Sequence, residues 1–277
     1  MNNDGRPRPQ LVAVTPRYLA GGPADYRGEL HHLAREHGWS VAAAVHRHGD
    51  RATSPCHRAK VYEARLSTRG PALSIDVQDT EERPLWHAAI TRHTPGEVVR
   101  PALTALAQAL RDDPPGDRNP RAIAAPPDLA SWSPAPGWLS FRDNDGILVH
   151  QAPDALATLV VREPADPAPS AHPPGTVYAF TGGPQDSRHS WSAEFSSTTP
   201  PAIIAAMYRA LADPEPLVRR PIEVPPHHWP HATITTLTPP MPARFAAAHL
   251  RSTAIAPHPV PAAELAQTPA AARRRTR

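Results

Sequence analysis

Histidines make a metal site the first chemistry to consider, because the chain contains 16 of them. Between His31 and His37 the offsets of five and six residues spread the rings around a helix, and the His-Glu-x-x-His pattern is absent. His227, His228 and His231 lie in a proline-rich segment, where a metal site would arise only by chance. We therefore expect surface histidines, with no metal site and no cofactor.

The residue spacing gives little support for nucleophilic catalysis. Cys56 and His57 are neighbours along the chain, whereas the partners of a catalytic dyad meet in space. Asp143, Asp145 and Asp154 have the positions of turn carboxylates, and a calcium loop starting at the first of them would need a glutamate where the last stands. Isolated glycine pairs do not make a phosphate-binding loop. We expect a protein that is not an enzyme.

The clearest pattern is structural and occurs twice. The motif Trp-x-Ala-x-apolar-x-x-x-Thr-Pro consists of Trp86, Ala88, Ile90, Thr94 and Pro95, and again of Trp191, Ala193, Phe195, Thr199 and Pro200. Its first half alternates as a half-buried strand does, and its second half is typical of a helix start, with threonine as N-cap and proline as first helical residue. Glu97 would complete a capping box in the first copy. Two copies roughly 100 residues apart predict two structural units.

The elements around the motif predict an α+β fold. Each repeat is expected to be an antiparallel sheet of four to five strands followed by one C-terminal helix that covers its apolar face. Each motif tryptophan could stack on a nucleic-acid base, but its small and aliphatic inward neighbours favour a core anchor. We expect a first repeat at 10–112 with an extra N-terminal strand and helix, a proline-rich linker at 113–132, a second repeat at 133–215, and a largely disordered basic tail at 216–277.

Charge is distributed unevenly along the chain. From Leu217 onward eight arginines face two glutamates, a net charge of +6, although the whole chain carries only +3. Between Ser133 and Pro216 four arginines face nine carboxylates, a net charge of −5. The folded part therefore lacks the basic footprint of a nucleic-acid-binding domain. Phosphate contacts would be left to the last arginines of the tail, Arg273, Arg274, Arg275 and Arg277.

The number of cysteines and the hydropathy of the chain indicate the cellular compartment of the protein. A single cysteine, Cys56, excludes an intramolecular disulfide and suits a reducing compartment. The chain does not open with a charged-then-apolar leader, and no apolar run approaches the roughly 18 residues of a membrane span. We expect a cytoplasmic protein without membrane attachment.

Three features together resemble a domain of unknown function, DUF317, that is seen chiefly in actinobacteria. They are the segment Pro16–Gly22, the helix that ends at Gly38-Trp39, and the two strand-helix junctions of the motif. The resemblance extends over residues 10–215 and implies a tandem arrangement, because members commonly carry two copies. Copy one departs from the family in having Cys56-His57 after Ser-Pro, where a Ser-Pro-Asp-type turn is usual. The resemblance implies no particular activity.

Two classes of function, with a third more remote, remain open from the sequence. The favoured one is a non-enzymatic binding or scaffold protein that uses its two sheet-and-helix modules to bind a protein partner. The alternative is a nucleic-acid-associated protein that uses the basic tail, and the remote alternative is an enzyme with a site between the repeats. Exposed aromatics beside arginines on the solvent face of the sheet would favour nucleic acid. The expected outward residues Ser192, Glu194 and Ser196 favour a protein partner.

Overall fold

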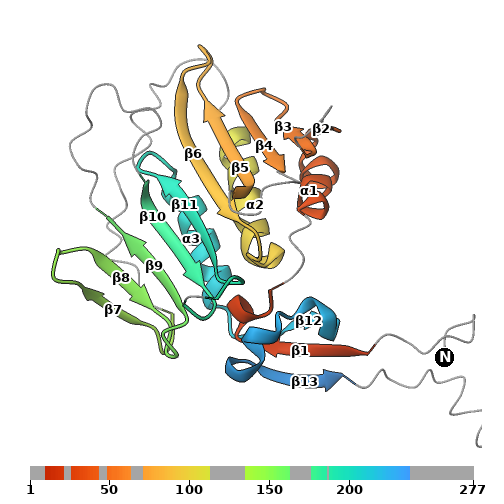
Figure 1. Ribbon diagram of the computed structural model, residues 1–277. Helices are drawn as coiled ribbons and strands as arrows, with labels where there is room; N and C mark the ends of the chain where they lie inside the picture. Colours follow the sequence, from red (N-terminus) through yellow and green to blue (C-terminus); the bar gives the residue numbers. More distant parts are fainter. Residues whose placement is uncertain are drawn as a thin grey trace, which may run out of the picture. The chain divides into compact units, whose positions relative to one another are not determined.

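An antiparallel sheet is the main element of this mixed α+β protein (Figure 1). The computed structural model describes residues 10–21, 26–43, 49–63, 71–112, 135–162, 176–185 and 187–237. Within these ranges the sheet has ten strands: β2 (Ser40–Ala42), β3 (Arg51–Thr53), β4 (Ala59–Glu63), β5 (Pro71–Gln78), β6 (Pro84–Thr91), β7 (Leu139–Arg142), β8 (Leu148–Gln151), β9 (Ala157–Val161), β10 (Thr176–Gly182) and β11 (Trp191–Ser196). Their spatial order is β2-β3-β4-β5-β6-β11-β10-β9-β8-β7, so β2 and β7 are the outermost strands. The α+β class and the antiparallel pairing are confirmed.

The middle of the sheet is the pairing of β6 with β11. These strands are antiparallel, and the register places Ala88 opposite Phe195, Ala89 opposite Glu194, and Ile90 opposite Ala193. The prediction of one sheet for residues 10–112 and another for residues 133–215 is therefore wrong, because the strands of these two ranges join in a single sheet. The physical reason is that an unpaired strand edge leaves N–H and C=O groups without partners, and β6 and β11 satisfy one another.

Side chains at the β6–β11 seam add a matched pair of hydrogen bonds. The His87 N–H donates to Ser196 Oγ at 3.1 Å, and the Ser192 N–H donates to Thr91 Oγ1 at 2.7 Å. Ser196 is buried by this contact, so the expectation that it faces solvent is wrong. The two bonds are related by a shift of 105 residues: His87 corresponds to Ser192, and Thr91 corresponds to Ser196. In each bond a backbone N–H donates to a side-chain hydroxyl of the other strand.

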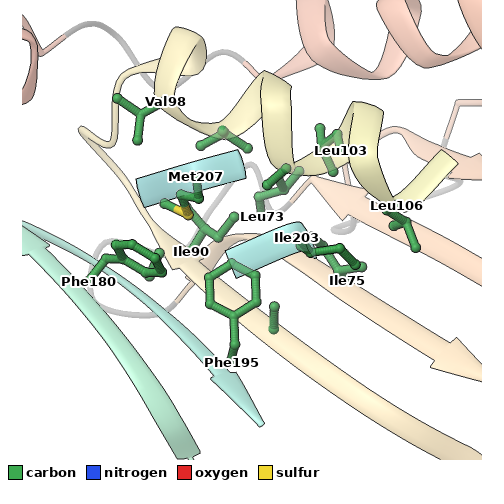
Figure 2. Close-up of a cluster of buried hydrophobic side chains, with 14 of the residues drawn as sticks. Leu73, Ile75, Ile90, Val98, Leu103, Leu106, Phe180, Phe195, Ile203 and Met207 are labelled. Atoms are coloured by element: carbon green, nitrogen blue, oxygen red, sulfur yellow. The ribbon is translucent and has the colours of Figure 1, made fainter. Parts of the chain in front are cut away.

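Two helices cover one face of the sheet. α2 (Gly96–Asp112) follows β6, α3 (Pro201–Ala212) follows β11, and they pack against each other (Figure 1). α1 (Arg27–His37) packs on α2 and ends at Gly38, whose φ of +71° is the left-handed conformation expected at a helix C-terminus. Figure 2 shows part of the core under these helices, which includes Leu73, Ile75, Ile90, Val98, Leu103, Leu106, Phe180, Phe195, Ile203 and Met207.

The start of each covering helix differs from the predicted cap. The helices begin at Gly96 and Pro201, one residue later than expected. The Thr94 hydroxyl donates to the carbonyl of Thr91 at 3.0 Å, and Thr199 Oγ1 is buried without a hydrogen-bond partner, so neither side chain serves as an N-cap. The capping-box role of Glu97 is also wrong, because this carboxylate binds an arginine from another part of the chain.

A second, three-stranded sheet is formed by segments far apart in sequence. Its order is β12-β1-β13, with β1 at Leu11–Thr15, β12 at Leu217–Arg219 and β13 at Thr233–Leu237. Short 3-10 helices stand beside these strands: η1 (Arg17–Leu19), η4 (Pro221–Glu223) and η5 (Pro226–His231). A small core of Val12, Val14, Ala20, Leu217 and Val224 holds the sheet together.

This sheet corrects the predicted boundary of the tail. Residues 217–237 are ordered in strands and 3-10 helices, although the whole of 216–277 was expected to be largely disordered. Frequent prolines conceal this order in the sequence, because the strands are short and are stabilised by β1, about 200 residues away along the chain. The expected linker at 113–132 and the tail from residue 238, including Arg273 to Arg277, lie outside the described residues.

Candidate functional site

The tryptophans of the repeated motif are core anchors and are not available for stacking on a ligand. Trp86 is 4 % exposed and Trp191 is 2 % exposed. The indole N–H of Trp191 donates to the Tyr18 carbonyl at 3.0 Å, which joins the large sheet to η1. A Cβ on Gly182 would lie 2.3 Å from the Trp191 ring, so only glycine leaves room for this indole. Both tryptophans are thus buried side chains of the hydrophobic core.

Two partly buried ion pairs connect the helices to neighbouring elements. Arg219 on β12 makes two hydrogen bonds to the Glu97 carboxylate, at 2.7 and 2.5 Å, and so ties the small sheet to α2. Burial would raise the pKa of Glu97, but the hydrogen bonds and charge of Arg219 outweigh it and lower that pKa. Arg100 on α2 binds Glu29 of α1 in the same bidentate manner, at 2.7 and 2.8 Å. These charged side chains are engaged in structural contacts.

The structure brings together histidines that belong to neither of the two sequence groups, His31–His37 and His227–His231, with one histidine of the second group. His93, His189 and His227 form a row, with ring centroids 4.9 Å apart for the first pair and 5.5 Å for the second. His228 is fully buried beside them, and its Nδ1 lies 2.8 Å from the Leu19 carbonyl. As the side chains stand in the described ranges, no group of three His, Cys, Asp or Glu residues is arranged to hold a metal ion.

The buried His228 makes stability depend on pH. Burial, together with the neighbouring His189 and His227, lowers its pKa below the ordinary value of 6.5. The unfolded chain therefore takes up a proton near pH 6.5 that the folded chain resists, so this contribution destabilises the fold as the pH falls through and below that value. We expect urea unfolding at pH 5.5 to show lower stability than at pH 7.5.

A matched pair of histidine variants tests this expectation. His228→Gln should flatten the pH dependence between the two values, whereas His31→Gln, at an exposed position of α1, should leave it unchanged. Equal pH dependence in wild type and His228→Gln would contradict the assignment.

The remaining candidates from the sequence have structural contacts. Asp143 Oδ1 accepts the N–H groups of Asp145 and Ile147 at 2.9 Å each and so closes the β7–β8 hairpin. Asp154 Oδ1 accepts the Tyr18 hydroxyl at 2.8 Å. The sulfur of Cys56 lies 3.4 Å from Ser54 Oγ. Asp143 is thus a turn carboxylate, as predicted, whereas Asp154 accepts both a turn N–H, from Leu156, and the distant Tyr18 hydroxyl.

The outer face of the large sheet, opposite the helices, changes character from one end to the other. We define it by two rows of residues that the strand register aligns: Ala42, Arg51 and Tyr62 across β2, β3 and β4, and Phe141, Val149 and Val160 across β7, β8 and β9. The first row contains a small, a charged and an aromatic residue, while the second is entirely apolar. At the β7 end the outer face thus has an apolar strip through Phe141, beside a row in which Leu139 is followed by the polar Gln151 and Thr158. At the β2 end it has a basic and an aromatic side chain instead.

The outermost strand β7 is the most exposed apolar part of this strip. Leu139 is 60 % exposed and Phe141 is 43 % exposed, and both point to the outer face. β7 pairs only with β8 among the described strands, so its other edge presents backbone N–H and C=O groups. The sequence predicted a strand here but not its position at the end of the sheet, and nothing in the local pattern marks an edge.

The opposite outermost strand, β2, is preceded by the same Gly-Trp pair as β7 but carries different side chains. Gly38 and Gly137, with φ of +71° and +81°, precede buried tryptophans that lead into β2 and β7. On the outer face β2 then presents Ser40 and Ala42, where β7 presents Leu139 and Phe141. β2 therefore lacks the exposed large apolar side chains that β7 carries. We define the β7 edge as Leu139–Arg142 with Val149 and Val160 behind it.

Comparison with protein families identifies one segment. Residues 151–217, from the end of β8 to the start of β12, match the family model described as SPDY, a domain of unknown function (DUF317). The match supports the resemblance in the second half of the chain. Neither the curated proteins nor the solved structures contain a match to this chain. No helix in the described ranges has the length and apolar character needed to cross a membrane.

Proposed function

We propose that this protein is a non-enzymatic binding or scaffold module that takes a protein partner on the β7 edge. The observation that carries the proposal is the contrast between the two outermost strands, of which only β7 exposes large apolar side chains. Singly exposed leucines are ordinary in soluble proteins, whereas an apolar strip next to an unpaired strand edge is a feature that proteins usually avoid unless it binds something.

The chemistry of such an edge suits an extended polypeptide. Backbone N–H and C=O groups of β7 would pair with a strand of the partner, which adds affinity without sequence preference. Leu139 and Phe141 would contact alternate side chains of that strand and favour apolar ones, with Val149 one strand further into the sheet. The partner is thus a protein with a strand or strand-forming segment that carries alternating apolar residues.

We propose further that the body is a tandem duplication, with the two copies joined as in an internal dimer. The register at the seam supports this. A shift of 105 residues relates Ala88 to Ala193 and Ile90 to Phe195, so the pair Ala88–Phe195 corresponds to the pair Ala193–Ile90. The pair Ala89 and Glu194 maps onto itself, which places a pseudo-two-fold axis there. The two outermost strands, β2 and β7, are then equivalent by descent and have diverged in surface chemistry.

Affinity capture from the native host, with and without nuclease, tests the partner class. We expect proteins that are retained after nuclease treatment and lost with the bait Leu139→Lys/Phe141→Lys. Ile222→Lys is the matched control, because this 90 % exposed side chain lies on η4 in the small sheet region and its replacement should leave capture unchanged. A captured set that is identical with all three baits would refute the β7 edge as the binding surface.

A second candidate function is association with nucleic acid, which one observation favours. Arg51 lies opposite Tyr62 on the outer face, with Lys60 beside them on β4, so a basic and aromatic surface exists at the β2 end. Asp76 also lies opposite Lys60, and its negative charge would oppose phosphate there. Because Asp76 offsets the positive charge at the β2 end, the C-terminal arginines are better placed than this surface to bind phosphate.

Deletion of residues 252–277 should therefore abolish any binding to DNA or RNA. The melting temperature should stay nearly unchanged, because the deleted residues lie outside the strands and helices described above. Binding is measured by fluorescence anisotropy at several salt concentrations. Steeply salt-dependent binding by the shortened chain would place the nucleic-acid contacts in the folded body instead.

A further inference from the structure

We infer that the β7 edge pairs with the β7 edge of a second copy of this chain, antiparallel and with a two-fold axis at Ser140. The inference rests on the proposed function, since it names the partner that occupies the same edge. The chain already contains one junction of this type, the antiparallel β6–β11 seam, whose register is symmetric about Ala89 and Glu194.

Strand parity limits the registers that a symmetric pair can adopt. In antiparallel pairing, residues directly opposite one another lie on the same face of the sheet. For the two copies to form one continuous sheet with all helices on the same face, a residue of β7 must therefore lie opposite the same residue of the other copy. The two-fold axis passes midway between these two residues. For β7, with four residues, the central choices are an axis at Ser140 or an axis at Phe141.

The side chains favour the axis at Ser140. Leu139 of each copy then lies opposite Phe141 of the other, and both belong to the outer face. An axis at Phe141 would instead place Leu139 opposite Asp143, a carboxylate that holds the β7–β8 turn. Pairing an apolar side chain with an apolar one buries both, whereas pairing it with a carboxylate would desolvate the charge.

The neighbours of β7 do not oppose this pairing. Arg142 is the charged residue of the strand, and its guanidinium donates to the Gly146 carbonyl at 2.6 Å within its own hairpin. In the Ser140 register it lies opposite Trp138, whose ring is buried between Tyr18 and Tyr208. Like charges are thus not brought together at the axis, and Val149 and Val160 extend the apolar contact behind it.

Light scattering coupled to gel filtration, over a wide range of concentration, is the first test. We expect the full chain to reach twice its mass of 29.9 kDa as the concentration rises. Phe141→Lys should weaken self-association about thirtyfold or more, as loss of a central interface residue does. The control is Ala42→Lys, at the equivalent exposed position of β2, which should leave it unchanged. A chain that stays monomeric throughout would overturn the inference.

A cross-link tests the register itself. In a Cys56→Ser background, Ser140→Cys places one thiol of each copy at the axis, where opposite Cα atoms of antiparallel strands are about 4.5–5.5 Å apart and within reach of a disulfide. We expect a covalent dimer on mild oxidation with this variant and not with Ala42→Cys. Equal cross-linking of the two would overturn the register.

The outcomes separate this inference from the proposed function. A monomeric chain whose capture of host proteins is still lost with Leu139→Lys/Phe141→Lys would overturn the self-pairing and leave the β7 edge as a binding surface for another protein. A dimer that persists in Phe141→Lys would overturn the β7 edge as its interface.

Discussion

Replacing Trp191 with alanine is expected to lower the free energy of unfolding by about 3–5 kcal/mol, the range for removing a large aromatic side chain from a core. The indole is 2 % exposed, fills the space that Gly182 leaves, and donates its N–H to the Tyr18 carbonyl. The variant leaves both a cavity and a carbonyl without its donor. In a protein of this size the melting temperature should fall by roughly 2–4 °C for each kcal/mol.

Two further variants separate the causes. Trp191→Phe keeps most of the apolar volume and loses the N–H donor, so it should cost about 1–3 kcal/mol, the cost of a buried polar group left unpaired. Trp229→Ala removes a tryptophan that is 48 % exposed on η5 and should cost far less. A loss below about 1 kcal/mol for Trp191→Ala, measured by urea unfolding, would mean that the ring is available for binding.

Phe195→Ala is the second large expected effect, and it tests whether the two halves share one core. The Phe195 ring is fully buried at the seam, where its backbone lies opposite Ala88, and it packs edge-to-face on Phe180 with ring centroids 5.9 Å apart. We expect a loss of about 3–5 kcal/mol. Because one hydrophobic cluster contains residues of both halves, calorimetry should show a single transition at lower temperature.

The alternative outcome for Phe195→Ala is distinct. If the halves folded independently, the second would melt early and the first would keep the wild-type melting temperature, which gives two transitions. Leu11→Ala serves as the control, because this side chain is exposed on β1 in the small sheet and should leave the transition close to that of the wild type.

Much of the local structure could be predicted from the sequence. The alternation of Trp86, Ala88 and Ile90, and of Trp191, Ala193 and Phe195, predicts both central strands, because side-chain direction in a strand has a period of two that any single segment reveals. Gly38 marks the end of α1 for a similar local reason, since a positive φ favours glycine. Such features depend on a few neighbouring residues and are therefore visible in the sequence.

The sequence was less informative about groups that pair over long distances. Glu97 has the position of a capping-box residue, yet it binds Arg219, 122 residues further along. The short strands β12 and β13 carry weak strand signals among prolines and exist because β1 pairs with both. Their stability comes from a partner that the local sequence does not reveal, which is why the sequence predicts that 216–277 is largely disordered.

What the sequence by itself determined was the α+β class, the buried tryptophan anchors and the repeated strand-helix motif, all of which follow from periodicity and from conformational preferences over a few residues. Only the tertiary structure decided that the strands of both halves form one sheet, that His228 is buried, and that β7 is an outermost strand. The physical reason is that backbone hydrogen bonding is the same for every residue type. The sequence therefore specifies which residues form strands far better than which strand edges meet and which remain open.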